Sequence, residues 1–165
     1  MIRKATSSDF HFLYYLYMHP QVNPYLLYEY MQQEDFHDVF NELQHKGVLY
    51  IFEELDEDIG MFKLMPQRFR NAHIAYLGGV AIDPEEAGKG FGLQMMEEII
   101  AFAKQQGYLR IELTVATSNT KAIQLYQKAG FHHEGVLKKY TYLKSKDQYV
   151  DEAVMAYIFD QGSGS

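Results

Sequence analysis

The segment IDPEEAGKGFGLQMMEEIIAFAKQQG, residues 82–107, decides the fold that the sequence predicts. Three glycines, Gly88, Gly90 and Gly92, precede a run whose apolar residues recur at helical spacing. Glycine at such a position costs backbone entropy, so the pattern indicates a place where bare backbone is needed. A helix N-terminus offers free N–H groups and the positive end of a dipole, and phosphate groups bind there. We therefore expect a phosphate-binding turn that leads into a helix over residues 88–106.

Three interpretations of AGKGFG are tested by spacing. A dinucleotide-binding fingerprint requires a third glycine where Leu93 stands, so this interpretation fails. A Walker loop fails because Gly90 follows Gly88-Lys89 where Ser or Thr is required. A turn whose N–H groups face the diphosphate of coenzyme A remains, with Lys89 adding positive charge. A flexible loop that merely caps a helix also remains open.

The rest of the chain is expected to alternate between strands and helices. The predicted strands cover residues 1–5, 48–55, 59–65, 73–82, 109–116, 135–144 and 149–159, and the further helices cover 10–19, 34–45 and 119–128. An acidic turn is expected at 56–58, and Gly78-Gly79 indicates a bulge or a close backbone approach within its strand. This order predicts one α+β domain over residues 1–160, and residues 161–165 resemble a tail left by cloning.

Composition limits the function classes. The chain has 165 residues and a net charge of −7, and an acidic balance argues against general nucleic-acid binding. It has no cysteine, and its seven histidines show no tight ligand spacing, so we expect no metal site. No apolar run reaches the roughly 18 residues of a membrane span, and MIRKATSSDF does not read as a signal peptide. We expect a cytoplasmic protein without a membrane partner.

Three segments carry a resemblance to a known family. VAIDPEEAGKGFGLQMMEEI, IELTVATSNTKAIQLYQKAGF and EGVLKKY with QYVDEAVMA resemble the GNAT family of acetyl-CoA-dependent N-acetyltransferases, most closely a bacterial branch that acetylates L-amino acids. The resemblance implies a central, mixed, mostly antiparallel twisted sheet flanked by about four helices, with two strands splayed at the acetyl-CoA site. It also implies acetyl-CoA as cosubstrate and a small-molecule amine as acceptor, and homodimers are common in the family.

The resemblance also implies which residues hold the coenzyme. The strand before the glycine turn would bind the pantetheine arm through its backbone, with an N–H near Val80 facing the thioester carbonyl. The turn would hold the diphosphate, Asn119 would contact the coenzyme besides capping its helix, and Lys128 would reach a phosphate. The implied set is Val80, Ala81, Ile82, Gly88, Lys89, Gly90, Phe91, Gly92, Leu93, Asn119 and Lys128. Ala87 departs from the family motif, where Gln or Arg usually stands, and this puts the affinity for the coenzyme in question.

The sequence predicts one residue as the catalytic acid but leaves several candidates for the catalytic base. Tyr126 matches the family tyrosine that protonates the departing thiolate, and a phenol with a reference pKa of ~10 is protonated at neutral pH. For the base that takes the proton of the amine, His73, Glu112 and Glu29 are all candidates. The acceptor pocket is expected in the tyrosine-rich segment 20–34.

The sequence thus predicts an N-acetyltransferase that acts on a primary amine of a small molecule, with an L-amino acid as the preferred acceptor. The resemblance implies direct transfer, and the absence of a cysteine that could carry an acyl group agrees with this. Two alternatives stay open: a polyamine or protein N-terminal acetyltransferase, and a non-catalytic acyl-CoA-binding sensor.

Overall fold

The computed structural model describes residues 1–160, and the tail expected at 161–165 lies outside the described residues. The chain divides into two compact units. Unit 1 comprises Met1–Leu64 and Gly79–Met95, and unit 2 comprises Met65–Gly78 and the residues from Met96 onward. Each unit is built from discontinuous pieces of the chain, and the single domain expected over 1–160 stays a prediction. Within the described residues, no helix combines the length and the apolar character that a membrane crossing needs.

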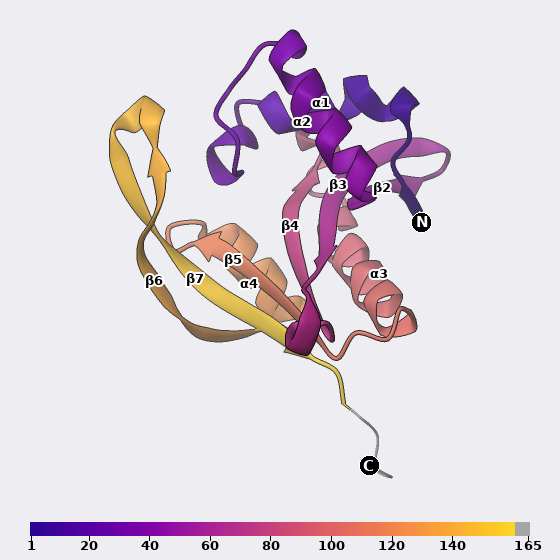
Figure 1. The fold of residues 1–165 in the computed structure, drawn as a ribbon, viewed down its shortest axis with the longest axis vertical. Coiled ribbons are helices and arrows are strands. Elements are labelled where there is room, and N and C mark those ends of the chain that lie inside the picture. Colours follow the sequence, from indigo (N-terminus) through magenta and orange to yellow (C-terminus); the bar gives the residue numbers. More distant parts are fainter. Residues whose placement is uncertain (161–165) are drawn as a thin grey trace. The chain divides into compact units, whose positions relative to one another are not determined.

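Seven strands and four α-helices follow one another in the predicted order (Figure 1). They are β1 (Ile2–Lys4), α1 (Phe10–Met18), α2 (Gln33–Lys46), β2 (Leu49–Glu54), β3 (Glu57–Pro66), β4 (Ile74–Ile82), α3 (Phe91–Gln105), β5 (Arg110–Ala116), α4 (Thr120–Ala129), β6 (His132–Leu143) and β7 (Gln148–Ile158). The strand order is β1-β2-β3-β4-β5-β7-β6, and β4 and α3 each contribute residues to both units. The α+β fold expected from the sequence is confirmed.

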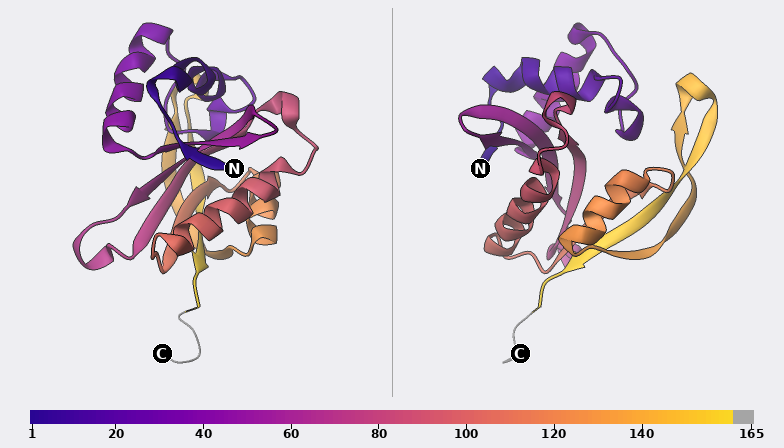
Figure 2. Two further views of the ribbon diagram at one scale, coloured as in Figure 1. Left: turned by 90° about the vertical axis from the view of Figure 1, so that its right-hand side faces the viewer. Right: turned by 180° about the vertical axis from the view of Figure 1, so that it is seen from behind.

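Strand pairing in unit 2 is mixed. β5 pairs antiparallel with β7, β7 pairs antiparallel with β6, and β4 pairs parallel with β5. The β4–β5 ladder comprises Ile74–Arg110, Ala75–Ile111 and Tyr76–Glu112, and both strands continue beyond it. β6 and β7 form a long, strongly twisted hairpin, with α4 lying along β5 (Figures 1 and 2). Side chains from four neighbouring strands therefore line each face of the sheet in this unit.

The core of unit 1 is rich in aromatic side chains. Phe10 of α1 packs against Phe36 and Phe40 of α2, with ring centroids 5.7 and 5.3 Å apart, and Tyr17 lies 5.5 Å from Phe36. These rings explain the apolar stripes of the two helices. Gly47 ends α2 in the left-handed conformation, as its position after Lys46 predicts.

Three predicted boundaries differ clearly from the structure, and backbone geometry or strand pairing explains each. The strand expected from residue 135 begins at His132, because His132 and His133 already pair with β7. The helix expected from residue 88 begins at Phe91, because Gly88 and Gly90 adopt φ angles of +80° and +84°, which a right-handed helix cannot contain. The turn expected at 56–58 lies at Leu55-Asp56, whose φ angles are 52° and 62°. Glu57 and Asp58 instead pair with β2.

The Arg3–Asp9 pair makes stability pH-dependent. Arg3 donates two hydrogen bonds of 2.8 Å to the Asp9 carboxylate, which is almost fully buried. Burial pushes the pKa of Asp9 upward, but the hydrogen bonds from Arg3 and from the Thr6 N–H outweigh it, so the pKa lies below its ordinary value of 3.8. The contribution of ionised Asp9 to the free energy of unfolding is thus fully present above pH ~3.8. It is lost as the pH falls through the lower pKa that Asp9 has in the folded protein.

We expect Asp9→Asn to lower the free energy of unfolding by about 2 kcal/mol at pH 7, since it removes a charge-assisted pair. The difference from wild type should shrink between pH 5 and pH 2, where Asp9 takes up its proton. Urea denaturation across this range measures it. Asp58→Asn, which removes a more exposed partner of Arg3, serves as the control. A difference that stays constant with pH would contradict this role of Asp9.

Candidate functional site

The glycine turn of unit 1 presents bare backbone at the start of α3. A β-carbon added at Gly88 or Gly90 would have no heavy atom within 4 Å. The positive φ angles there turn the chain into α3, whose first N–H groups have no intrahelical partner. Phe91, Gly92 and Leu93 provide those groups. A diphosphate fits this combination of open space, free donors and the positive dipole end.

The segment before the turn is fixed by short hydrogen bonds. Asp83 follows β4, and its N–H donates to the Ile59 carbonyl at 2.8 Å. Its carboxylate accepts from the Glu85 N–H at 3.1 Å and from the Tyr15 hydroxyl at 2.8 Å. The Lys89 ammonium lies 2.7 Å from the Glu86 carboxylate, so it is paired within the turn and would have to change partner to meet a phosphate. Ala87 donates its N–H to the Pro84 carbonyl at 3.2 Å.

The second half of β4, Gly79–Ile82, also belongs to unit 1. Gly79 has a φ angle of +57°, and a β-carbon there would lie 2.7 Å from the Tyr17 hydroxyl. The group that lies close to Gly79 is thus a side chain, whereas the sequence suggested a bulge or a close backbone approach. Ala81 is buried, and Val80 and Ile82 are partly exposed. The distorted backbone leads directly into the three residues proposed to hold the pantetheine arm.

In unit 2, α4 carries the predicted acid. Asn119 caps the helix, its side chain accepting from the Ala122 N–H at 3.3 Å, and Gly130 ends it at a φ angle of 109°. The capping role expected for Asn119 is confirmed.

Tyr126 lies in the last turn of α4 and is 8 % exposed, with its ring 6.1 Å from that of Phe131. Burial, and to a lesser degree the charge of Tyr76, raises the pKa of Tyr126 well above 10, so the phenol keeps its proton. Lys128 is exposed.

One face of the unit 2 sheet is only partly covered. On β5, Ile111, Leu113 and Val115 are buried, whereas the alternate residues are half-buried. We call the face of these alternate residues the open face. Tyr76 of β4 shares it, and its hydroxyl lies 3.1 Å from that of Thr114. The open face thus brings polar groups of neighbouring strands together.

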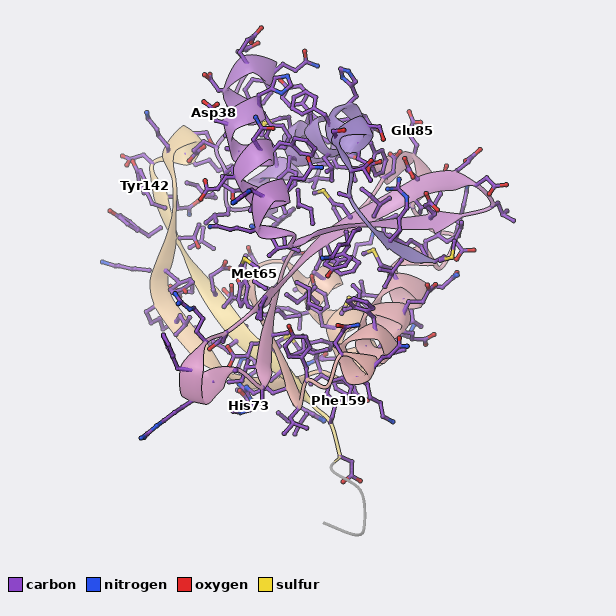
Figure 3. The ribbon with its side chains drawn as sticks, turned by 45° about the vertical axis from the view of Figure 1, so that its right-hand side comes forward. Asp38, Met65, His73, Glu85, Tyr142 and Phe159 are labelled. Atoms are coloured by element: carbon purple, nitrogen blue, oxygen red, sulfur yellow. The ribbon has the colours of Figure 1, made fainter. Side chains whose placement is uncertain are left out.

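The three residues predicted from the sequence as candidate bases lie in different surroundings. Glu112 lies on the open face, but its carboxylate accepts from Arg110 at 2.9 Å and from Gln67 at 3.1 Å, which leaves it poorly placed to take a proton. His73 is exposed at the start of β4, at the end of unit 2 away from Tyr142 near the hairpin tip (Figure 3). Glu29 is exposed in the segment before α2 of unit 1.

Sequence reasoning missed Glu152 of β7. Its backbone pairs with Ala116, which places its side chain on the open face. One carboxylate oxygen accepts from Thr141 at 3.4 Å, and the other is buried without a hydrogen-bond partner in the described part of the chain. Burial raises the pKa of Glu152 and the Thr141 bond only partly offsets this. A carboxylate with a free oxygen and a raised pKa has the properties of a base.

Sequence reasoning also missed Lys63 of β3, in unit 1. It is 5 % exposed, and no carboxylate pairs with it among residues 1–160. A signal was present, since Lys63 is the one charged residue in the apolar run IGMFKLM. Lysine is almost never fully buried without a partner, which makes this position a candidate binding site.

Comparisons with known proteins agree with the fold described above. The model of the acetyltransferase (GNAT) family matches residues 10–131. The L-amino acid N-acetyltransferase AaaT of Escherichia coli (strain K12) is 30 % identical, over 96 % of this chain and 97 % of its own length.

Two solved structures share the fold. The spermidine N-acetyltransferase of Vibrio cholerae, solved in complex with CoA and spermine, has a TM-score of 0.83 at 23 % identity over 96 % of this chain and 94 % of its own. A phosphinothricin acetyltransferase of Sinorhizobium meliloti, solved in complex with acetyl-CoA, has a TM-score of 0.78 at 19 % identity over 100 % of this chain and 91 % of its own.

Proposed function

The chain belongs to the acetyltransferase (GNAT) family, and from that premise we propose that it acetylates the α-amine of a free L-amino acid. It is an N-acetyltransferase, and acetyl-CoA is its cosubstrate. The acceptor is the proposed part. Its main support is the relative named as an L-amino acid N-acetyltransferase, which aligns over nearly the whole length of both chains. Homodimerisation and a cytoplasmic location stay predictions from the sequence.

The observation that carries the coenzyme site is the glycine turn. Gly88 and Gly90 hold φ angles that other residues rarely adopt, and they leave open space beside the first N–H groups of α3. In the proposal, residues 88–93 bind the diphosphate and the backbone of Val80–Ile82 binds the pantetheine arm. Asn119 and Lys128 are included in the proposal because the family motif implies that they contact the coenzyme.

Tyr126 is proposed to supply the proton that the leaving sulfur needs. In direct transfer the amine nitrogen bonds to the thioester carbonyl carbon, and the carbon–sulfur bond breaks. Tyr126 donates its hydroxyl proton to the thiolate, which is otherwise a poor leaving group. Because burial raises the pKa of the phenol, Tyr126 carries this proton throughout the neutral range. An N–H at Val80 stabilises the negative charge on the carbonyl oxygen.

Glu152 is proposed to accept the proton that the amine loses. The unpaired oxygen of its carboxylate supports this role over Glu112, whose oxygens are engaged by Arg110 and Gln67. Tyr76 and Thr114 share the open face with Glu152 and provide hydroxyl groups along which a water could relay the proton. His73 and Glu29 are exposed, whereas Glu152 is partly buried.

Glu152→Gln is expected to lower kcat at pH 7, because an amide cannot accept the proton of the amine. The loss should be only about tenfold, because solvent water can partly take over the role of the carboxylate. In the wild type, kcat should rise with pH as Glu152 loses its proton, and this rise should be absent from the variant. Steady-state rates from pH 5 to 9 measure both effects. Glu134→Gln, which removes an exposed carboxylate paired with Arg110, is the control and should leave the profile unchanged. An unaltered profile for Glu152→Gln would remove Glu152 from the reaction.

A panel of acceptors tests the proposed substrate class. Release of free CoA from acetyl-CoA is followed with the twenty amino acids, spermidine and short peptides with free N-termini. We expect turnover with one or more L-amino acids. Preferred turnover of spermidine or of the peptides would instead favour the polyamine or protein N-terminal alternative. Tight calorimetric binding of acetyl-CoA without turnover on any amine would favour the sensor.

A further inference from the structure

A buried polar cluster lies against the backbone of Gly79 in unit 1. Measured from the position of a β-carbon at Gly79, the Tyr17 hydroxyl is 2.7 Å away and the Cε of Lys63 is 3.6 Å away. The two side chains come from α1 and β3, and only a glycine leaves room for them here. The Tyr17 hydroxyl and the end of the Lys63 side chain therefore lie beside the same residue of β4.

Neither polar group of this cluster makes a hydrogen bond or an ion pair within residues 1–160, although the Lys63 ammonium faces an aromatic ring. Tyr17 is 1 % exposed, and its hydroxyl makes no hydrogen bond there. Lys63 has no carboxylate near its ammonium, and the ring of Tyr28 lies 5.2 Å from its Nζ. Burial, with a smaller contribution from Lys46, lowers the pKa of Lys63. A buried hydroxyl without a hydrogen bond and a largely buried lysine without a carboxylate each cost stability, which points to a ligand that satisfies both.

The donors define the chemistry of that ligand. Lys63 offers N–H donors and Tyr17 an O–H donor, so the complementary group is an anion with at least two oxygens. A carboxylate meets this requirement. A polyamine does not, because its ammonium groups would face a lysine and would offer no acceptor atoms.

The position of the cluster fits the acceptor proposed above. Gly79 directly precedes Val80, whose N–H is the proposed contact for the thioester carbonyl. In an α-amino acid the amine and the carboxylate share one carbon atom. The group that binds the carboxylate must therefore lie within a few ångströms of the reacting centre, as Lys63 and Tyr17 would.

We propose that Lys63 and Tyr17 bind the carboxylate of the amino-acid acceptor and thereby select amino acids over amines that lack it. This inference rests on the proposed function and deepens it. The segment 26–32 covers the cluster with Tyr28, and Asn23 fastens this segment by donating to the Tyr17 and Tyr28 carbonyls at 2.8 and 2.9 Å.

The test compares an amino acid with its amide. The L-amino acid with the highest kcat/KM in the acceptor panel is assayed beside the amide of that same amino acid, in wild type, Lys63→Met and Tyr17→Phe. The amide differs in amine pKa as well as charge, but this difference is the same for every variant. The readout is therefore the change in the acid-to-amide ratio of kcat/KM. Lys46→Met, which removes a nearby exposed lysine paired with Glu42, is the matched control.

We expect Lys63→Met to lower the acid-to-amide ratio at least tenfold and Tyr17→Phe to lower it about threefold, with Lys46→Met at the wild-type ratio. If Lys63→Met fails to fold, the milder Tyr17→Phe variant decides the test. Calorimetric binding of the N-acetylated amino acid and of its amide to wild type then adds a second measurement. An unchanged ratio in Tyr17→Phe and Lys63→Met would overturn the carboxylate site while the enzyme still acetylates amino acids. Absence of amino-acid turnover in wild type would instead refute the proposed function.

Discussion

Tyr126→Phe lowers kcat about a hundredfold and leaves the KM for acetyl-CoA within about twofold of wild type. The phenylalanine keeps the ring in its buried position beside Phe131, so packing is preserved and only the hydroxyl is lost. Without it, the thiolate must leave unprotonated or take a proton from water. General acid catalysis by a placed side chain contributes about a hundredfold or more. Initial rates at varied acetyl-CoA and acceptor concentrations separate kcat from KM.

Tyr157→Phe is the matched control for this variant. Tyr157 packs against the same Phe131 ring, at 5.8 Å, and also loses only a hydroxyl in the change. We expect its kcat to stay within about twofold of wild type. If Tyr126→Phe and Tyr157→Phe behave alike, Tyr126 is a packing residue and another group protonates the sulfur.

The second large effect is expected on coenzyme binding. Gly90→Val should weaken acetyl-CoA binding about thirtyfold, as measured by calorimetry. A β-branched residue rarely tolerates a φ angle of +84°, so the turn would relax to another conformation in the free protein. Restoring the binding conformation then costs about 2 kcal/mol, and each 1.4 kcal/mol is a factor of ten in Kd. A β-carbon at residue 90 would meet no protein atom within 4 Å, so the substitution creates no clash at that atom in the free protein.

Gly107→Val provides the matching change at the other end of α3. Gly107 also has a positive φ angle, +91°, and open space around its missing β-carbon. Its replacement imposes the same kind of backbone strain away from the proposed diphosphate turn. The Kd for acetyl-CoA should therefore stay near that of wild type. Equal losses in the two variants would show that helix stability, rather than the turn, controls binding.

The sequence predicted the fold well because its signals are local. Glycines and polar caps at helix ends, together with apolar spacing, produced the correct order of strands and helices. Gly47, Gly130 and Asn119 end or begin their helices as expected. The errors arose where two local preferences competed. The glycines before α3 favour a turn over a helix, and Leu55-Asp56 adopts left-handed geometry without a glycine to announce it.

The candidate site was less predictable, because burial and pairing depend on residues distant in sequence. Glu112 and Glu152 both read as polar residues within strands, yet Arg110 and Gln67 engage one while the other keeps an unpaired oxygen. Lys63 stood out in an apolar strand, but only the structure brings it to Tyr17 and Gly79. Motif residues could be proposed from the resemblance, whereas the surroundings of Glu152, Lys63 and Tyr17 could not.

The fate of the acetyl group tests the central claim most directly. Acetyl-CoA labelled with carbon-13 in the acetyl group is mixed with stoichiometric protein, without and then with the preferred L-amino acid, and all species are weighed by mass spectrometry. The account predicts no labelled protein without the acceptor, and labelled N-acetyl amino acid with one CoA released for each acetyl group transferred when it is present. Label bound covalently to the protein, or CoA release without an acetylated amine, would contradict direct transfer to an amino acid.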